Sequence, residues 1–295
     1  MRRSGWAFFA LFSLLVTGCL DQSDFDTGKQ LTEDIQTIDN FLASSGITAI
    51  KDPSGVRFHL DVVGTGFPPN VSQTVKINYT GKFLNGTVFD AGPTITSPLG
   101  SFILGWQYGI SVWPKGSKGT LYVPSPLGYG NSSTNSVIPP NSILVFDVEL
   151  ADVVLSNAEK ARFTNDTTAI ATFLQTHEVN AIKDSTGIAY VITDPGEGDP
   201  PTWYQQVKFN YTGKALTTGN TFFTGVATPS DQFSSRVVDF INGIKFGLRK
   251  IGKGGKITVY IPSIHAFGPS DNSTTSLPAN SNVIYDLELT DIVSN

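Results

Sequence analysis

The chain has 295 residues, of which 40% are hydrophobic and 15% are charged, and its formal net charge is −5. This length is sufficient for two domains of ordinary size, each with its own hydrophobic core. Basic residues do not cluster, which argues against a nucleic-acid partner. The single cysteine excludes an internal disulfide, and three scattered histidines argue against a metal site.

The N-terminus has the features of an export signal. Arg2 and Arg3 precede an apolar run over residues 6–16, which is too short to remain as a membrane-spanning helix. The segment Leu15-Val16-Thr17-Gly18-Cys19 resembles a bacterial lipobox, in which the cysteine is acylated and becomes the new N-terminus. We therefore predict a signal peptide over residues 1–18, lipidation of Cys19, and a lipid-anchored membrane protein of the bacterial cell envelope. The alternative is an ordinary signal peptide with an incidental cysteine.

The next segments predict a tether, a helix and a strand. Residues 19–30 are polar, as in a flexible tether between membrane and first domain. Apolar residues at helical spacing predict a helix over 31–46, with Thr32, Glu33 and Asp34 supplying capping groups at its start. Residues 56–62 alternate between apolar and polar side chains, which indicates a half-buried strand with Arg57 on its solvent-facing side.

Short strands and one short helix follow. They comprise a strand ending at Tyr79, a hairpin turn at Asn85-Gly86, a loop over 91–101, a helix within 102–110, a strand at 121–123, a long loop over 124–140 and a strand over 143–154. Several short strands with one central helix indicate a small antiparallel α+β domain.

This whole pattern occurs twice. Residues 76–82 read Lys-Ile-Asn-Tyr-Thr-Gly-Lys, and residues 208–214 read Lys-Phe-Asn-Tyr-Thr-Gly-Lys. A repeat with this spacing has the size of a domain. Because a helical segment precedes each copy, we predict two domains, at 31–155 and 156–295, each with its own N-terminal helix.

A series of short motifs points to one family. They occur in the order Tyr79-Thr80-Gly81, Phe89-Asp90, Gly105-Trp106, Tyr129-Gly130, Ile138-Pro139-Pro140 and Leu144–Leu150. In this order they resemble the FKBP-type peptidyl-prolyl isomerases. The resemblance is good across residues 55–154 and looser across residues 187–293. The resemblance implies, in each domain, an antiparallel sheet of five or six strands wrapped around a short central helix, with an apolar pocket between them and no cofactor.

The resemblance also implies roles for residues of the first domain. Tyr79, Asp90 and Tyr129 would be catalytic, with Asp90 against the rotating carbonyl and oriented by Tyr79, and Tyr129 donating its hydroxyl. Trp106 would form the pocket floor, and the backbone N–H of Ile103 would bind a substrate carbonyl. The substrate-binding set is Phe89, Phe102, Ile103, Trp106, Ile138 and Phe146. For any one of these aromatic residues, simple core packing is the alternative role.

The first copy departs from the family pattern in one loop. The loop over residues 92–101 is about two residues shorter than the resemblance leads us to expect. The position of an aromatic wall residue falls on Ile95 or Ser97. We therefore expect the pocket to be open on this side.

The second copy has lost the polar groups at the matching positions. The Phe-Asp pair becomes Phe222-Phe223, the floor Trp becomes Ile244, and the donor Tyr becomes Phe267. The residues of this degenerate second pocket are Tyr211, Phe222, Ile241, Ile244, Phe267, Leu277 and Tyr285. A pocket that keeps its apolar character without fixed dipoles can bind a prolyl peptide, but we expect no catalysis from it.

The chemistry of prolyl isomerisation agrees with such a site. Rotation about an amide bond faces a barrier of about 18–20 kcal/mol, and no covalent bond is made or broken, so no nucleophile, metal or cofactor is needed. The leading hypothesis is a prolyl isomerase that acts on X-Pro peptides, assists the folding of exported client proteins, and is held at a membrane by lipidated Cys19. The alternative is a non-catalytic peptide- or protein-binding chaperone or scaffold lipoprotein of the cell envelope.

Overall fold

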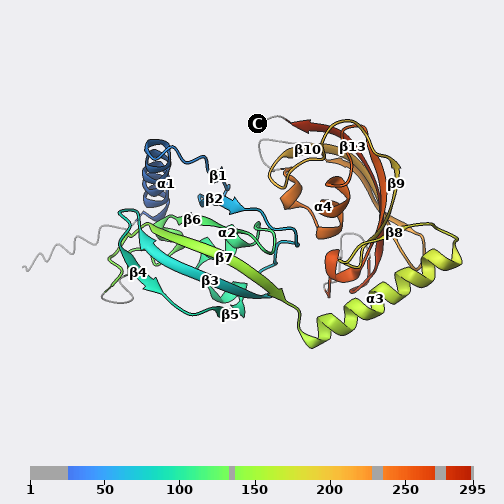
Figure 1. Cartoon of the computed structure of the whole chain (residues 1–295), viewed down its shortest axis with the longest axis horizontal. Helices are drawn as coiled ribbons and strands as arrows, with labels where there is room; N and C mark the ends of the chain where they lie inside the picture. Colours follow the sequence, from blue (N-terminus) through green and yellow to red (C-terminus); the bar gives the residue numbers. More distant parts are fainter. Residues whose placement is uncertain (1–25, 133–136, 228–234, 270–276, 294–295) are drawn as a thin grey trace, which may run out of the picture.

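A computed structural model gives the fold of the chain and describes residues 26–132, 137–227, 235–269 and 277–293. The predicted signal peptide, Cys19 and the first part of the predicted tether lie outside these ranges. Two domains of the same architecture follow one another, joined where the last strand of the first leads into a long helix (Figure 1). Each domain has an antiparallel sheet curved around a short helix, as predicted.

The described part of the first domain contains two helices, two short 3-10 turns and seven strands. Its elements are α1 (Thr27–Ser44), β1 (Ile50–Lys51), β2 (Arg57–Val62), β3 (Thr74–Phe83), β4 (Val88–Ala91), β5 (Ile95–Pro98), η1 (Leu99–Ser101), α2 (Leu104–Ile110), β6 (Lys118–Val123), η2 (Ser125–Leu127) and β7 (Leu144–Val154). The strand order is β1-β2-β6-β7-β3-β4, with β5 beside β3. The sheet therefore has one more strand than the five or six that the family resemblance implied.

The second domain repeats this order with six strands. Its elements are α3 (Asn157–Thr176), β8 (Ile182–Lys183), β9 (Ala189–Asp194), β10 (Gln206–Ala215), β11 (Thr221–Ala227), η3 (Val237–Asp239), α4 (Asn242–Leu248), β12 (Lys256–Ile261), η4 (Ser263–His265) and β13 (Val283–Val293). The order β11-β10-β13-β12-β9-β8 is that of the first sheet, strand for strand.

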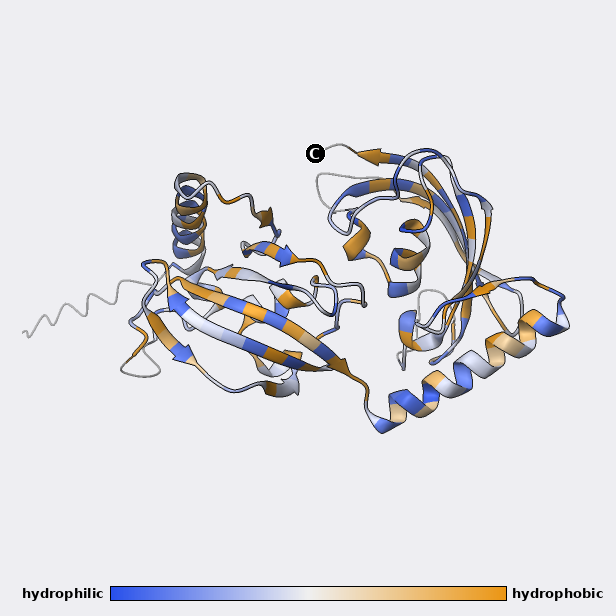
Figure 2. Cartoon of the chain, viewed as in Figure 1, coloured by the Kyte–Doolittle hydropathy of each residue, from blue (hydrophilic) through white to orange (hydrophobic). Residues whose placement is uncertain are grey.

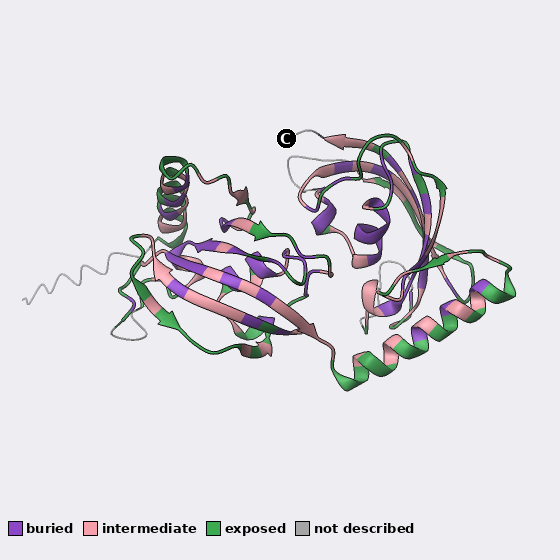
Figure 3. Cartoon of the chain, viewed as in Figure 1, coloured by how far each residue is buried: buried purple, intermediate pink, exposed green. Residues whose placement is uncertain are grey.

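Each sheet is covered on both faces, because its strands carry apolar residues on both. On the concave face of the first sheet, Leu121 and Val123 pack with α2; on the other face, Tyr122 and Val145 pack with Ile38 of α1. This alternation follows from the two-residue period of a strand and is visible as changing colours along β3 and β7 (Figure 2). Buried residues form one side of α1, whereas α4 is buried almost all round (Figure 3).

Three predictions about local structure were wrong. Helix α1 begins at Thr27, with the Asp26 side chain accepting hydrogen bonds from the next turn, so Thr32–Asp34 do not cap it and the tether ends before residue 27. The predicted loop over 91–101 contains β5, which pairs with β3. Arg57 is buried because α1 covers its side of the sheet, where the guanidinium lies 2.9 Å from Asp39. This ion pair lowers the pKa of Asp39.

A buried carboxylate joins each N-terminal helix to a turn of its own domain. Asp34 of α1 is 4% exposed and accepts hydrogen bonds from the backbone N–H and the hydroxyl of Ser125, at 2.7 and 2.6 Å. Asp166 of α3 accepts the same two bonds from Ser263, at 2.9 and 2.7 Å. Because Tyr129 follows Ser125 closely, the helix helps to position the loop that carries this residue.

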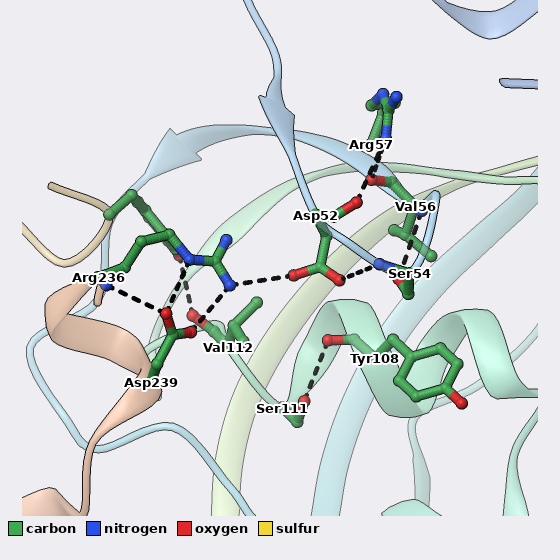
Figure 4. Close-up of polar contacts among 10 residues, drawn as sticks. Asp52, Ser54, Val56, Arg57, Tyr108, Ser111, Val112, Arg236 and Asp239 are labelled. Carbon is green, nitrogen blue, oxygen red and sulfur yellow. Dashed lines mark hydrogen bonds and ion pairs between the residues drawn. The ribbon is translucent and has the colours of Figure 1, made fainter. Parts of the chain in front are cut away.

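Direct contacts join the two domains. The Tyr204 hydroxyl donates to the carbonyl oxygen of Val112 at 3.0 Å, and the Tyr204 ring packs edge-on against Phe58 at 5.4 Å. Arg236 of the second domain lies 3.3 Å from Asp52 of the first (Figure 4). Both of these side chains are about one-tenth exposed, so the pair is largely shielded from solvent.

His265 also lies at this interface, its ring 4.6 Å from that of Phe67. Its Nε2 donates to the carbonyl oxygen of Thr186 at 3.1 Å, while its Nδ1 is buried with no partner among the described residues. Burial lowers the pKa of His265 to about 4. The ring is therefore neutral at neutral pH.

Replacing Asp34 with alanine should destabilise the protein by about 2 kcal/mol, because two donors of Ser125 lose their buried acceptor. Urea unfolding of the full chain measures this change. Glu33→Ala is the matched control, since Glu33 is on the same helix and exposed. Equal unfolding midpoints for the two variants would contradict the anchoring role of Asp34.

Acidification should weaken the fold through His265. The unfolded ring binds a proton near its ordinary pKa of 6.5, whereas the folded ring does so only near 4. Stability is therefore retained above pH 6.5 and lost as the pH falls toward 4, with about 2 kcal/mol lost by about pH 5. Urea unfolding at neutral and acidic pH measures this loss, which should be smaller in His265→Gln and unchanged in the exposed-ring control His59→Gln. An identical loss in all three proteins would exclude His265 as its source.

Candidate functional site

Aromatic rings from three elements meet in the first domain. Trp106 on α2 is 3% exposed and lies beneath Tyr79 of β3 and Phe146 of β7, with ring centroids 5.2 Å apart in both pairs and nearly perpendicular planes. Phe102, which precedes α2, lies 5.0 Å from the same indole. These residues were predicted to wall one pocket, and the structure brings them together.

A polar pair lies beside these rings. The Tyr79 hydroxyl donates to Oδ2 of Asp90 at 2.6 Å. Desolvation, and secondly the hydrogen bond to Asp90, raise the pKa of Tyr79 to about 12. Tyr79 is thus protonated at neutral pH, and its hydroxyl holds the Asp90 carboxylate in one orientation. This is the geometry that the sequence analysis expected of the two residues.

A glycine explains part of the repeated Asn-Tyr-Thr-Gly-Lys segment. A Cβ atom on Gly81 would lie 2.6 Å from the Phe89 ring, and one on Gly213 would lie 2.8 Å from the Phe222 ring. At these distances the ring would have to shift, so glycine lets the ring approach the strand closely. Both domains therefore keep the glycine together with an aromatic residue on the neighbouring strand.

The remaining predicted residues surround this centre. Ile103 is the N-cap of α2, and its N–H has no hydrogen-bond partner within the described ranges. Tyr129 is 39% exposed and close enough to contribute to the raised pKa of Tyr79. Ile138 is buried, and Phe89 packs edge-on against Phe146 at 5.7 Å. The free backbone N–H of Ile103 and the hydroxyl of Tyr129 thus lie around the aromatic floor.

The side of the pocket expected to be open carries no aromatic ring. Ile95 of β5 pairs with Ile77 of β3 and packs against the core. The Ser97 hydroxyl lies 2.9 Å from that of Ser101. The segment is therefore an ordered edge strand with small and aliphatic side chains.

The second domain has a cavity of about 450 Å³ at the matching place. Its lining residues are Phe209, Tyr211, Phe223, Ala227, Asp239, Phe240, Ile241, Ile244, Phe267 and Tyr285. Five of the predicted second-pocket residues are in this set. The other two, Phe222 and Leu277, are not: Phe222 packs edge-on against Tyr285 at 5.9 Å, and Leu277 is buried in the core.

The floor of this second pocket is aromatic, which the sequence analysis missed. Phe209 of β10 is fully buried and packs edge-on against Phe240 at 5.0 Å. In the first domain the residue aligned with Phe209 is Ile77, and the residue aligned with Ile244 is Trp106. The large ring has moved from the helix to the strand, and this paired change was the signal that could have revealed it.

The second pocket has polar groups at positions other than those that match Asp90 and Tyr129. Phe223 replaces Asp90 and stacks on Tyr211 at 5.6 Å. However, Tyr285 adds a hydroxyl where the first domain has Phe146, and burial raises the pKa of this phenol above its ordinary range. Asp239 adds a carboxylate at the rim.

Asp239 is held by Arg236, which donates to its two oxygens from the backbone N–H and from the guanidinium at 2.9–3.2 Å.

The described residues include no group of three or more side chains suited to a metal ion. In the same ranges, no helix is long and apolar enough to cross a membrane.

Comparison with known proteins gives similar sequences over one domain's length. The chain is 43% identical over 101 residues to the FKBP-type peptidyl-prolyl cis-trans isomerase FkpA of Aeromonas hydrophila, covering 33% of this chain and 37% of that protein. It is 35% identical over 133 residues to the outer membrane protein MIP of Legionella longbeachae, covering 42% and 56%. The chain thus spans about two fifths to three fifths of the length of these relatives.

Solved structures with the same kind of domain are also similar. The three FKBP domains of wheat FKBP73 are 20% identical, with 84% of this chain and all of that chain covered and a TM-score of 0.34. FkpA from Escherichia coli is 26% identical, with 47% and 73% covered and a TM-score of 0.35. The sequence profile of one family matches residues 67–151 and 198–290, which together exceed half of the chain. The chain therefore belongs to the FKBP-type peptidyl-prolyl cis-trans isomerase family.

Proposed function

We propose that this chain is a peptidyl-prolyl cis-trans isomerase and that its first domain catalyses the reaction. The observation that carries the proposal is the Tyr79–Asp90 hydrogen bond beside the buried Trp106 ring. Simple core packing does not require a carboxylate and a phenol fixed beside an apolar floor. Prolyl isomerisation can use both groups. The second domain lacks this combination.

The geometry suggests how rotation is accelerated. The prolyl ring rests on Trp106 and leaves water, so the polar planar amide is destabilised relative to the less polar twisted one. The free N–H of Ile103 binds the carbonyl of a neighbouring peptide unit, and the Tyr129 hydroxyl donates on the amide carbonyl side. Asp90, held by Tyr79, lies against the rotating carbonyl. All of these groups act without a cofactor.

The second domain serves in this proposal as a binding module. Its pocket keeps an aromatic floor and walls, so an apolar group can be bound there. The positions of Asp90 and Tyr129 are taken by Phe223 and Phe267, which removes the two polar groups assigned to catalysis. Binding without selective stabilisation of the twisted amide does not increase the rate.

The N-terminal sequence supports a place at a membrane of the cell envelope. The pattern Leu15–Cys19 fits lipidation of Cys19. Two or more lipid chains are sufficient to anchor a protein stably at a bilayer. The proposed clients are exported proteins with X-Pro bonds. One relative is itself named an outer membrane protein.

A non-catalytic binding protein of the cell envelope is the second candidate. Two observations favour it: the β5 side of the first pocket has no aromatic wall, and Tyr129 is 39% exposed. A pocket open to water on one side desolvates the amide less completely. An isomerase assay separates the two candidates.

Asp90→Val and Tyr129→Phe in the full chain should each lower the rate of isomerisation of a short X-Pro peptide by about tenfold, equal to about 1.4 kcal/mol of lost transition-state stabilisation. Phe223→Val, at the position of Asp90 in the second domain, is the matched control and should retain the wild-type rate. Unchanged rates in both first-domain variants would refute the assignment of these polar groups, and an inactive wild-type chain would favour the binding protein.

A further inference from the structure

A second cavity lies between the two domains. It has a volume of about 430 Å³ and is lined by Thr48, Ala49, Ile50 and Lys51 of the first domain and by Tyr204, Gln206 and Arg236 of the second. The first four residues are consecutive and include all of β1. The cavity and the second pocket both fall within the range of about 300–1,000 Å³ that is usual for ligand sites.

One wall of this cavity is the edge of the first sheet. Among the described residues, strand β1 is the last strand in the order and pairs with β2 alone, through Ile50 opposite Phe58 and Lys51 opposite Arg57. The N–H of Asp52 donates to the carbonyl oxygen of Val56. Because hydrogen-bonded residues alternate along an antiparallel pair, Ile50 bonds to β2, while the N–H groups of Ala49 and Lys51 point away from it. Such an edge offers a template on which another extended chain can add a strand.

Arg236 stands between this cavity and the second pocket. Its side chain lines the cavity, and its guanidinium holds both Asp239, at the rim of the second pocket, and Asp52, beside β1 (Figure 4). The Nη1 nitrogen makes no hydrogen bond to the described residues and can donate to a carbonyl oxygen. The cluster of Arg236 with Asp239 and Asp52 has one positive and two negative charges. It therefore has no excess positive charge and does not require an anionic ligand.

We propose that the two cavities form one site for an extended polypeptide segment. The backbone of this segment pairs with the edge of β1, one of its carbonyl oxygens accepts a hydrogen bond from Arg236 Nη1, and the next apolar side chain enters the second pocket. The inference rests on the proposed role of the second domain as a binding module and is independent of catalysis by the first.

The chemistry of the walls favours a polypeptide over a compact small molecule. The interdomain cavity presents unpaired backbone donors and small or uncharged side chains such as Thr48, Ala49 and Gln206. These groups recognise a peptide backbone rather than a particular side chain. The adjoining pocket, with its floor of Phe209, adds a site for a large apolar side chain. A client held here would also raise the effective concentration of its prolines near the first pocket.

The test uses the full chain and a fluorescein-labelled peptide of about ten residues, alternating threonine and serine around one central phenylalanine and lacking proline. Binding is measured by fluorescence anisotropy. Thr48→Trp places a large ring in the interdomain cavity, because Thr48 lines it, is exposed and belongs to no core cluster, and Ala227→Trp fills the mouth of the second pocket. Val226→Trp is the matched control, because the neighbouring side chain in a strand points to the opposite face.

The proposal expects each of Thr48→Trp and Ala227→Trp to weaken binding by at least about tenfold, and Val226→Trp to bind as the wild type does. A probe N-methylated at alternate backbone nitrogens should bind the wild type about tenfold less tightly and should no longer sense Thr48→Trp. Absence of wild-type binding, or binding that is indifferent to both Thr48→Trp and N-methylation, would overturn the composite site. Since the probe has no proline, neither result bears on isomerisation.

Discussion

The space between each curved sheet and its short helix has to be filled by a large aromatic ring. The first domain fills it from the helix with Trp106, and the second fills it from the strand with Phe209. The choice of side has consequences for the rest of the pocket. With the indole on the helix, Tyr79 lies across it and its hydroxyl reaches Asp90; with the ring on the strand, Phe240 covers it and the matching phenol, Tyr211, stacks on Phe223. The position of the large ring, on the helix or on the strand, thus differs together with the presence or absence of a fixed carboxylate in the pocket.

The two domains also differ in what surrounds them. The C-terminal end of α2, through Val112, abuts the second domain, whereas the polar groups around Trp106 lie toward the other end of that helix. The rim of the second pocket is instead part of the domain contact, because Arg236 bonds both Asp239 and Asp52. A chain with one pocket away from the interface and one beside it can divide two tasks between them, which supports the proposed separation of catalysis from client binding.

Period-two patterns, turn signals and the internal repeat were sufficient to predict two antiparallel domains with central helices. The Tyr79–Asp90 pairing was expected from the family resemblance, and it forms because the two residues lie on adjacent strands of one hairpin. Other features depend on contacts that no local pattern encodes. Asp34 meets Ser125 across 91 positions of sequence. The exchange at positions 209 and 244 is visible in the aligned copies, but only the fold shows that the two positions face one cavity. Arg57 was misjudged because alternation along a strand does not reveal that a helix covers its second face.

The most direct test of the account is prolyl isomerisation of a short X-Pro peptide by residues 26–155 and by residues 156–295, each first checked for folding by circular dichroism. The account predicts that the first half accelerates isomerisation and that the second half does not, although it folds. Acceleration by the second half at the rate of the first would contradict the assignment of catalysis to the Tyr79–Asp90 pair. A folded first half without activity would contradict the proposed isomerase function itself.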